Sequence, residues 1–183
     1  MKQENPTKGK LTMRKIICGT MVIGLSAIIG CTPSEEQIKT TATAIGYAAG
    51  LVANETSIKD EARNAVVEIL NDVRSCVPIE GQSFESAWTP IIKEKVAALI
   101  ESGKIDATTG TIVTTVALIA AKGVDYLFDV RFPQAKQYAE LVAAGASGAI
   151  DGFLAVFKPV NQTRETVKDY DKDAYEWLKS RHT

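Results

Sequence analysis

After residue 33, apolar residues recur every three or four positions along most of the chain, a spacing that gathers them on one face of an α-helix. The pattern is clearest beyond Ser57, where charged side chains fall on the face opposite to the apolar one. It predicts an amphipathic helix that opens at Ser57, whose hydroxyl would cap the first turn. The apolar face of this segment comprises Ala62, Val66, Ile69, Leu70 and Val73.

Polar residues that favour helix starts divide the rest of the chain. Ser34 precedes Glu35 and Glu36, and acidic side chains in a first turn face the positive end of the helix dipole. We expect this first helix to end near Asn54. Because strand signals are weak, the sequence predicts an all-α fold, a single bundle of about five to six helices. The expected helices begin at Ser34, Ser57, Ser83, Asp106, Gln134 and Thr163.

Two segments leave alternatives open. Pro90 either lies in the first turn of a helix capped by Thr89 or kinks a longer helix from Ser83, since its ring removes one backbone hydrogen bond. The β-branched stretch 111–116 could form a buried strand, but the alanine-rich sequence after it favours a helix. As a helix, this segment is nearly apolar on all sides, which is typical of the central helix of a bundle.

Small residues recur in two of the expected helices. Ala42, Gly46 and Gly50 follow one another at every fourth position, and the segment 145–152 carries three glycines. A ridge of small side chains lets another helix approach closely, in soluble bundles and in membranes alike. We expect these two helices to form a close-packed pair, with packing in a soluble bundle favoured over a contact inside a membrane.

The first 30 residues have a different character. Residues 1–15 carry five basic side chains and one acidic side chain, and residues 16–30 carry no charge. A positive segment followed by a short apolar run is typical of a secretory signal peptide. The run is shorter than the roughly 20 apolar residues that a transmembrane helix needs. Translation could also start at Met13, which directly precedes Arg14 and Lys15.

The apolar run ends in Ile28-Ile29-Gly30-Cys31, which resembles the lipobox of bacterial lipoproteins. The resemblance implies cleavage of the signal after Gly30 and acylation of Cys31 by chains such as palmitate. The alternative is an uncleaved anchor helix with an incidental cysteine. The expected organisation is a signal peptide over 1–30, an acylated N-terminus and first helix over 31–56, and the remainder of one helical bundle domain over 57–183.

The position after the cysteine bears on the destination. In proteobacterial lipoproteins an aspartate there favours retention in the inner membrane, and this chain has Thr32. The resemblance therefore implies a lipid-anchored protein of the cell envelope, located in the outer membrane if the host has two membranes. The longest glycine- and alanine-rich candidate of the body, residues 141–157, is interrupted by Asp151, so we expect the lipid alone to hold the body to the membrane.

Charge and cysteine content narrow the classes of partner. The chain has 21 basic and 22 acidic residues, and removal of the basic leader leaves an acidic mature domain. Such a domain does not suit nucleic acid or anionic lipid, so the expected partners are membrane lipid, through acylated Cys31, and a protein of the envelope. With Cys18 in the leader, Cys76 has no partner for an internal disulfide and is expected to be buried.

Residues that could carry out chemistry are few. The single histidine, His182, lies next to the C-terminus, so a histidine-based catalytic triad and a two-histidine metal site are excluded. Asp125 and Asp129 share a helix face beside Arg131 and could act as an acid–base pair or hold a cation, although a solvated helix end explains them equally well. Asp151 lies in an apolar setting and could pair with a lysine or a helix terminus, or face water.

Asp169, Asp171 and Asp173 alternate as in the opening of a calcium-binding loop, but the glycine and the closing glutamate of such a loop are missing, so a solvated helix face is preferred. The sequence therefore predicts no catalytic, cofactor-binding or metal-binding residues.

The sequence predicts a non-enzymatic protein that acts as a scaffold, an assembly factor, or an immunity or exclusion factor. The alternatives are a membrane-anchored hydrolase or lytic enzyme that uses carboxylates, and a subunit of a membrane or pore complex.

Overall fold

The computed structural model describes residues 33–56, 58–79, 81–157 and 170–182. These residues form six α-helices and, within the described ranges, no β-strand. A π-helical turn (Leu127–Arg131) and a 3-10 turn (Pro133–Gln137) connect the fourth helix to the fifth. The predicted all-α bundle is therefore confirmed. The helices are α1 (Glu35–Asn54), α2 (Asp60–Val73), α3 (Phe84–Glu101), α4 (Ala107–Tyr126), α5 (Ala139–Phe157) and α6 (Lys172–His182).

Three of the predicted helix starts are present, and capping side chains explain them. The Ser34 hydroxyl accepts a hydrogen bond from the backbone N–H of Gln37, whose side chain accepts one in return from the Ser34 N–H. Ser83 and Asp106 each accept the N–H of the third residue beyond them. These bonds satisfy N–H groups that have no partner inside the helix, so the starts of α1, α3 and α4 follow from local sequence.

Two predicted starts are wrong. α2 begins at Asp60, after Lys59 and without a side-chain cap, whereas the predicted cap Ser57 lies outside the described residues. α5 begins at Ala139 instead of Gln134, because the 3-10 turn occupies residues 133–137 and Tyr138 has an extended backbone (φ −111°, ψ 102°).

The structure decides between the open alternatives. Pro90 lies inside α3, so the longer helix from Ser83 forms. Residues 111–116 belong to α4 and are helical. The predicted start of the last helix at Thr163 lies outside the described residues, and the described α6 begins at Lys172.

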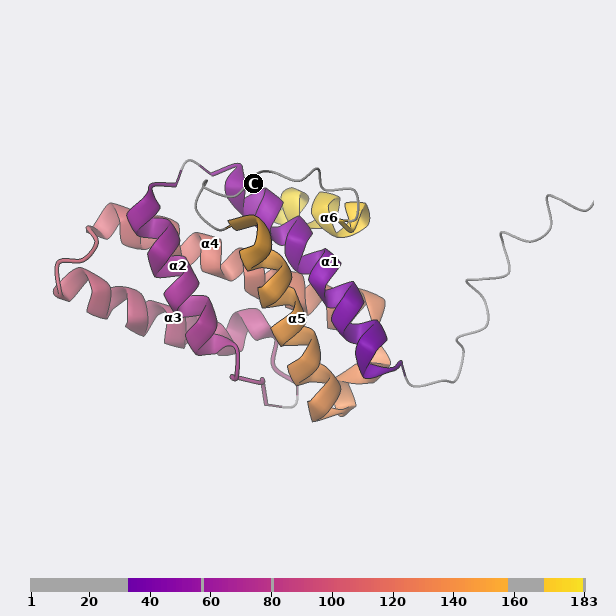
Figure 1. The fold of residues 1–183 in the computed structure, drawn as a ribbon. Helices are drawn as coiled ribbons and strands as arrows, with labels where there is room; N and C mark the ends of the chain where they lie inside the picture. The colour runs from indigo at the N-terminus through magenta and orange to yellow at the C-terminus, as the bar shows by residue number, and fades with distance from the viewer. Residues whose placement is uncertain (1–32, 57, 80, 158–169, 183) are drawn as a thin grey trace, which may run out of the picture. The chain divides into compact units, whose positions relative to one another are not determined.

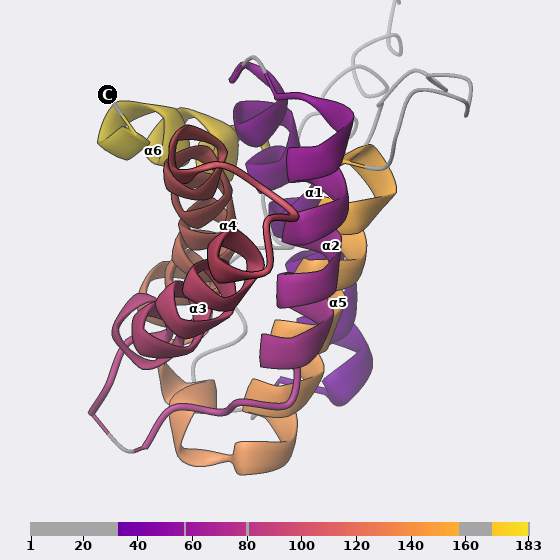
Figure 2. The same ribbon diagram turned by 90° about the vertical axis from the view of Figure 1, so that its left-hand side faces the viewer.

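The helices form two layers. Figure 2 shows α1, α2 and α5 on one side of the bundle and α3 and α4 on the other, and in Figure 1 α5 lies between α1 and α2. α4 contacts each of the other five α-helices. The prediction of a central helix in this segment is therefore confirmed, and its nearly uniform apolar surface is explained by its many neighbours.

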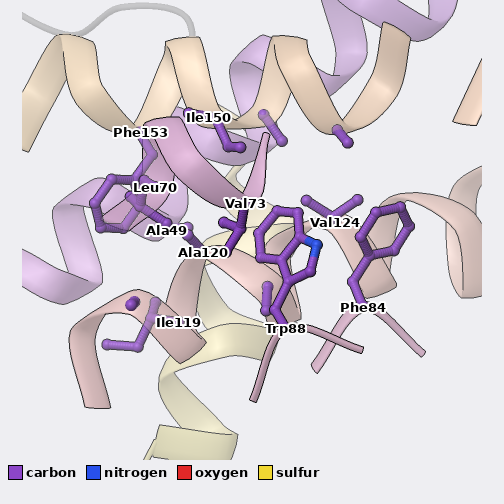
Figure 3. Packing of buried hydrophobic residues seen from close by; sticks show 14 of the residues in the cluster. Ala49, Leu70, Val73, Phe84, Trp88, Ile119, Ala120, Val124, Ile150 and Phe153 are labelled. Carbon is purple, nitrogen blue, oxygen red and sulfur yellow. The ribbon is translucent and has the colours of Figure 1, made fainter. Parts of the chain in front are cut away.

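In the core between the layers, Trp88 lies among aliphatic side chains and other aromatic rings, which include Phe84 and Phe153 (Figure 3). Trp88 of α3 is fully buried and packs edge-on against Phe84, with the ring centroids 5.3 Å apart. Its indole N–H donates a hydrogen bond of 2.8 Å to the carbonyl oxygen of Cys76. Because a buried indole N–H needs an acceptor, this bond ties α3 to the loop that follows α2.

α1 and α5 are in direct backbone contact. Lys39, near the start of α1, lies against Gly148, and Asn54 at its end donates a hydrogen bond to the carbonyl oxygen of Val156, so the two helices run parallel. A Cβ atom placed on Gly46 would lie 1.8 Å from the carbonyl oxygen of Ala149. The predicted close-packed pair is confirmed.

One glycine of that predicted pair has another neighbour. Gly145 faces the π-helical turn, where an added Cβ would lie 2.5 Å from the ring of Phe128 and 2.9 Å from the side chain of Leu127. Gly145 therefore makes room for the connection between α4 and α5 and not for α1.

α6 packs against α1 and α4. The Asp171 carboxylate accepts the Ala174 N–H at 2.9 Å, as a helix cap does, and also forms an ion pair of 2.5 Å with Arg131. Trp177 packs on Tyr126 with the ring centroids 5.0 Å apart. An aromatic contact and an ion pair thus hold the final helix to the end of α4.

Candidate functional site

A pocket of about 580 Å³ lies where the α2–α3 loop faces the start of α5. Its volume falls in the range of small-molecule sites. Phe84 and Phe128, which stack with their ring centroids 6.1 Å apart, form part of its apolar lining. The polar lining comes from Gln82, Asp125, Gln134, Lys136 and Gln137.

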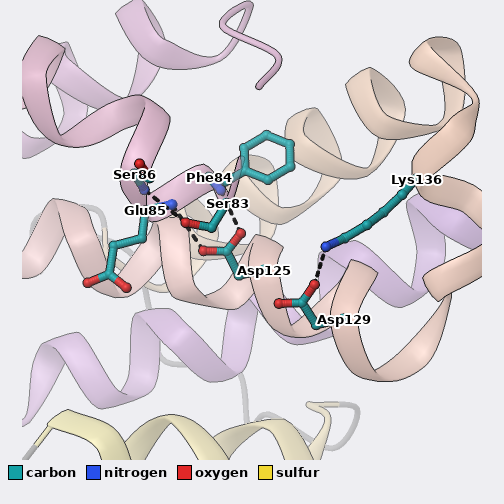
Figure 4. Close-up of polar contacts among 7 residues, drawn as sticks. All are labelled: Ser83, Phe84, Glu85, Ser86, Asp125, Asp129 and Lys136. Carbon is teal, nitrogen blue, oxygen red and sulfur yellow. Dashed lines mark hydrogen bonds and ion pairs between the residues drawn. The ribbon is translucent and has the colours of Figure 1, made fainter. Parts of the chain in front are cut away.

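Asp125 lies near the end of α4 and has an exposed fraction of 8%. Among the residues that the structure describes, no other charged residue is buried. Its two carboxylate oxygens accept the backbone N–H groups of Phe84 and Glu85, at 2.6 and 3.0 Å (Figure 4). Ser83 caps the same helix end by accepting the Ser86 N–H. Asp125 and Ser83 together satisfy the free N–H groups at the start of α3, so the carboxylate joins α4 to the positive end of α3.

Burial raises the pKa of the Asp125 carboxyl above the ordinary value of 3.8, and the charges of Asp129 and Glu85 act in the same direction. The N–H groups of Glu85 and Phe84 oppose this shift because they favour the ionised form. The folded protein therefore holds the proton more tightly than the unfolded chain does. Stability from this group is fully present below pH 3.8 and is lost as pH rises through the raised pKa.

This sign gives a testable pH dependence. Asp125→Asn cannot titrate, so the free energy of unfolding of the natural protein should fall relative to that of the variant as pH rises above about 4. Urea unfolding, followed by circular dichroism at several pH values, measures the difference. If the natural protein instead became more stable relative to Asp125→Asn as pH rises, the two N–H bonds would outweigh burial in setting the pKa of Asp125.

The two carboxylates predicted as a possible acid–base pair have separate partners. Asp129 lies one turn beyond Asp125, on the π-helical turn, and forms an ion pair with Lys136 while remaining half exposed (Figure 4). Arg131 pairs with Asp171, the residue that caps α6, instead of with either of them. This arrangement gives each of the two carboxylates a separate structural partner.

The other acidic candidates are also engaged in the fold. Asp151 faces solvent and forms an ion pair of 2.6 Å with Arg74, so its partner is an arginine of the chain. Asp171 caps α6, and the Arg131 guanidinium lies within ion-pair distance of both Asp171 and Asp173, at 2.5 and 3.6 Å, so an arginine holds the place between these carboxylates. Asp169 lies outside the described residues.

Cys76 and His182 are both partly exposed in the structure. Cys76 is half-buried and packs against the core, which is less than the full burial expected for it. His182 is half-exposed in the last turn of α6. The predicted cleavage residue Gly30 and the predicted acylation site Cys31 lie outside the described residues.

No group of three or more potential metal-ligating side chains occurs among the residues that the structure describes. Comparison of the chain with known protein families, with curated proteins and with solved structures finds no match.

The sequence did not reveal the pocket. Its wall combines the α2–α3 loop with residues 133–142, segments that are brought together by tertiary packing alone. Ile79, a pocket residue with an exposed fraction of 77%, had no periodic pattern to mark it. The detectable signal was an aspartate, Asp125, in a largely apolar helix, since such a residue needs a partner.

Proposed function

We propose that this protein is a bacterial lipoprotein whose helical domain is held on the cell envelope by acyl chains on Cys31 and acts there through protein–protein contacts. The observation that carries the proposal is the apolar run that ends in Ile28-Ile29-Gly30-Cys31. The cap of α1, Ser34, lies three positions after the cysteine. Such a short tether would hold the bundle close to the lipid.

Scaffolding, assembly, and immunity or exclusion are the roles we propose for these contacts. The carboxylates that could have served catalysis are bound to Phe84, Glu85 and Lys136, so the described residues favour contact over chemistry. The outer membrane is the proposed location in a host with two membranes, because Thr32 follows the cysteine.

Acylation has a direct test. Mass spectrometry of the protein from the membrane fraction should show an N-terminus at Cys31 that carries acyl chains, and Cys31→Ser should leave the full-length precursor uncleaved. Cys76→Ser is the matched control, since it removes a thiol from the domain and should leave processing unchanged. Cleavage at another position, or an unmodified Cys31 in the mature protein, would refute the proposal.

A second candidate, a subunit of a membrane or pore complex, is favoured by two helical segments. Ala107–Arg131 and Ala139–Phe157 are long and apolar enough, by length and composition, to cross a membrane. The second segment meets these two criteria although it contains Asp151. Within the fold, 67% and 61% of these apolar windows are buried, which a bundle core explains equally well.

The two candidates differ in how the body is held. If residues 32–183 are exported behind an ordinary cleavable signal, a domain held by lipid alone should enter the soluble fraction. Retention in the membrane through a carbonate wash would instead support the membrane-complex subunit.

A further inference from the structure

The exposed large apolar side chains of the described residues are on the connections at one end of the bundle. Val77 and Ile79, with exposed fractions of 38% and 77%, are on the α2–α3 loop. Val130, at 51%, is on the π-helical turn, and Tyr138, at 36%, directly precedes α5. We call these four side chains the end patch. Exposed apolar side chains gathered at one end of a domain are typical of a contact surface.

The end patch lies at the end where α1 begins. α1 and α5 run parallel, so their first turns are at the same end, and Val77 and Ile79 line the same pocket as Ala139 of α5. Figures 1 and 2 both show the start of α1, the α2–α3 loop and the turn before α5 on the lower side of the bundle.

Chain length brings the anchor to this end. Pro33 is the first described residue, and Cys31 is two residues away. Consecutive Cα atoms are about 3.8 Å apart, so the Cα atom of Cys31 lies within roughly 8 Å of that of Pro33 whatever the path between them. The acyl chains would therefore enter the membrane next to the end of the bundle that carries the end patch.

We propose that the end patch rests on the lipid surface in which the acyl chains of Cys31 are embedded, so that the bundle stands with the α1 start towards the membrane. This inference rests on the proposed acylation. Four side chains are too few to hold a free protein on a bilayer, but a short tether raises the local concentration of lipid, so a weak contact becomes populated. Tyr138 suits such a position, because tyrosine favours the boundary between lipid and water.

The charged residues near the end patch determine which lipid is the appropriate probe. The same end carries the exposed acidic side chains Glu35, Glu36 and Glu140, and Lys136, two residues before Tyr138, is paired with Asp129. Attraction should therefore come from the apolar side chains and not from anionic headgroups, and uncharged phosphatidylcholine vesicles are the appropriate probe.

The experiment uses the mature acylated protein reconstituted into these vesicles, on a Cys76→Ser background. Ile79→Cys labelled with an environment-sensitive fluorophore reports on the end patch. Lys104→Cys, labelled in the same way, is the matched control, because it is an exposed residue in the α3–α4 loop at the other end of the bundle. We expect the label at position 79 to shift to shorter emission wavelength and to be quenched by spin-labelled lipid several-fold more strongly than the label at position 104.

Each outcome bears on a separate claim. Acylated protein in which both labels are quenched equally little overturns the lipid contact and leaves the proposed lipoprotein standing. A wavelength shift at position 79 without quenching by lipid shows that a protein, such as a second copy of this chain, covers the patch, and also overturns the lipid contact. An unmodified Cys31, seen by mass spectrometry before reconstitution, overturns the proposed lipoprotein and with it this orientation.

Discussion

Replacing Gly46 by alanine is expected to destabilise the protein by about 3 kcal/mol or more, and replacement by leucine should destabilise it further. The added Cβ would lie 1.8 Å from the carbonyl oxygen of Ala149, 2.6 Å from its carbonyl carbon and 2.8 Å from its Cα. All three are backbone atoms, so no side-chain rotation relieves the overlap and α1 must move away from α5.

The separation would spread along the whole contact. Gly152 of α5 is packed against the backbone of α1 in the same way, since an added Cβ there would lie 2.0 Å from the carbonyl oxygen of Thr43. Domains of this size are stable by only about 5–15 kcal/mol, so loss of the α1–α5 contact removes a large share of the total. Chemical unfolding followed by circular dichroism measures the change in the free energy of unfolding.

Gly110→Ala is the matched control. Gly110 is also a buried helical glycine, but an added Cβ there meets side-chain methyl groups and no backbone atom: Ile100 Cδ1 at 2.7 Å, which can rotate away, and Val96 Cγ1 at 2.9 Å. Alanine is the better helix former by about 1 kcal/mol, so this variant should be far less harmful. If Gly46→Ala were as stable as the natural protein, the helices would not be in backbone contact in solution.

Removing the Asp125 carboxylate should have the second largest effect. Asp125→Ala leaves the N–H groups of Phe84 and Glu85 without their acceptor, and the Phe84 side chain is only 4% exposed, which restricts the approach of water. Leaving a buried donor unsatisfied costs about 1–3 kcal/mol. The start of α3 would also lose a negative charge at the positive end of its dipole.

Asp129→Ala is the control for this change, because it removes a carboxylate one turn along the same segment. Asp129 is half exposed and its partner is the exposed Lys136, so the expected cost is at most about 1 kcal/mol. Chemical unfolding of both variants at neutral pH makes the comparison. Equal effects would contradict a special role of Asp125 in joining α3 to α4.

The helix starts show how far local sequence reaches. Ser34, Ser83 and Asp106 were identified from their residue types, because a capping side chain bonds to a backbone group within three residues. The start of α5 was placed too early, since Gln134 carries no signal that separates a 3-10 turn from an α-helix. The extended Tyr138 separates the 3-10 turn from α5, and the 3-10 turn packs against the π-helical turn Leu127–Arg131, a contact between connections that the sequence pattern does not show.

The sequence by itself determined the all-α class and the pairing of α1 with α5, because apolar periodicity and a ridge of small residues are written along each helix. Only the tertiary structure decided what Asp125 does and where the exposed apolar side chains gather. Asp125 and Phe84 are 41 residues apart, and Val77 and Tyr138 lie on different connections of the bundle. Contacts between residues so far apart in sequence depend on how the helices assemble. Neither segment shows a periodic pattern that would predict its partner.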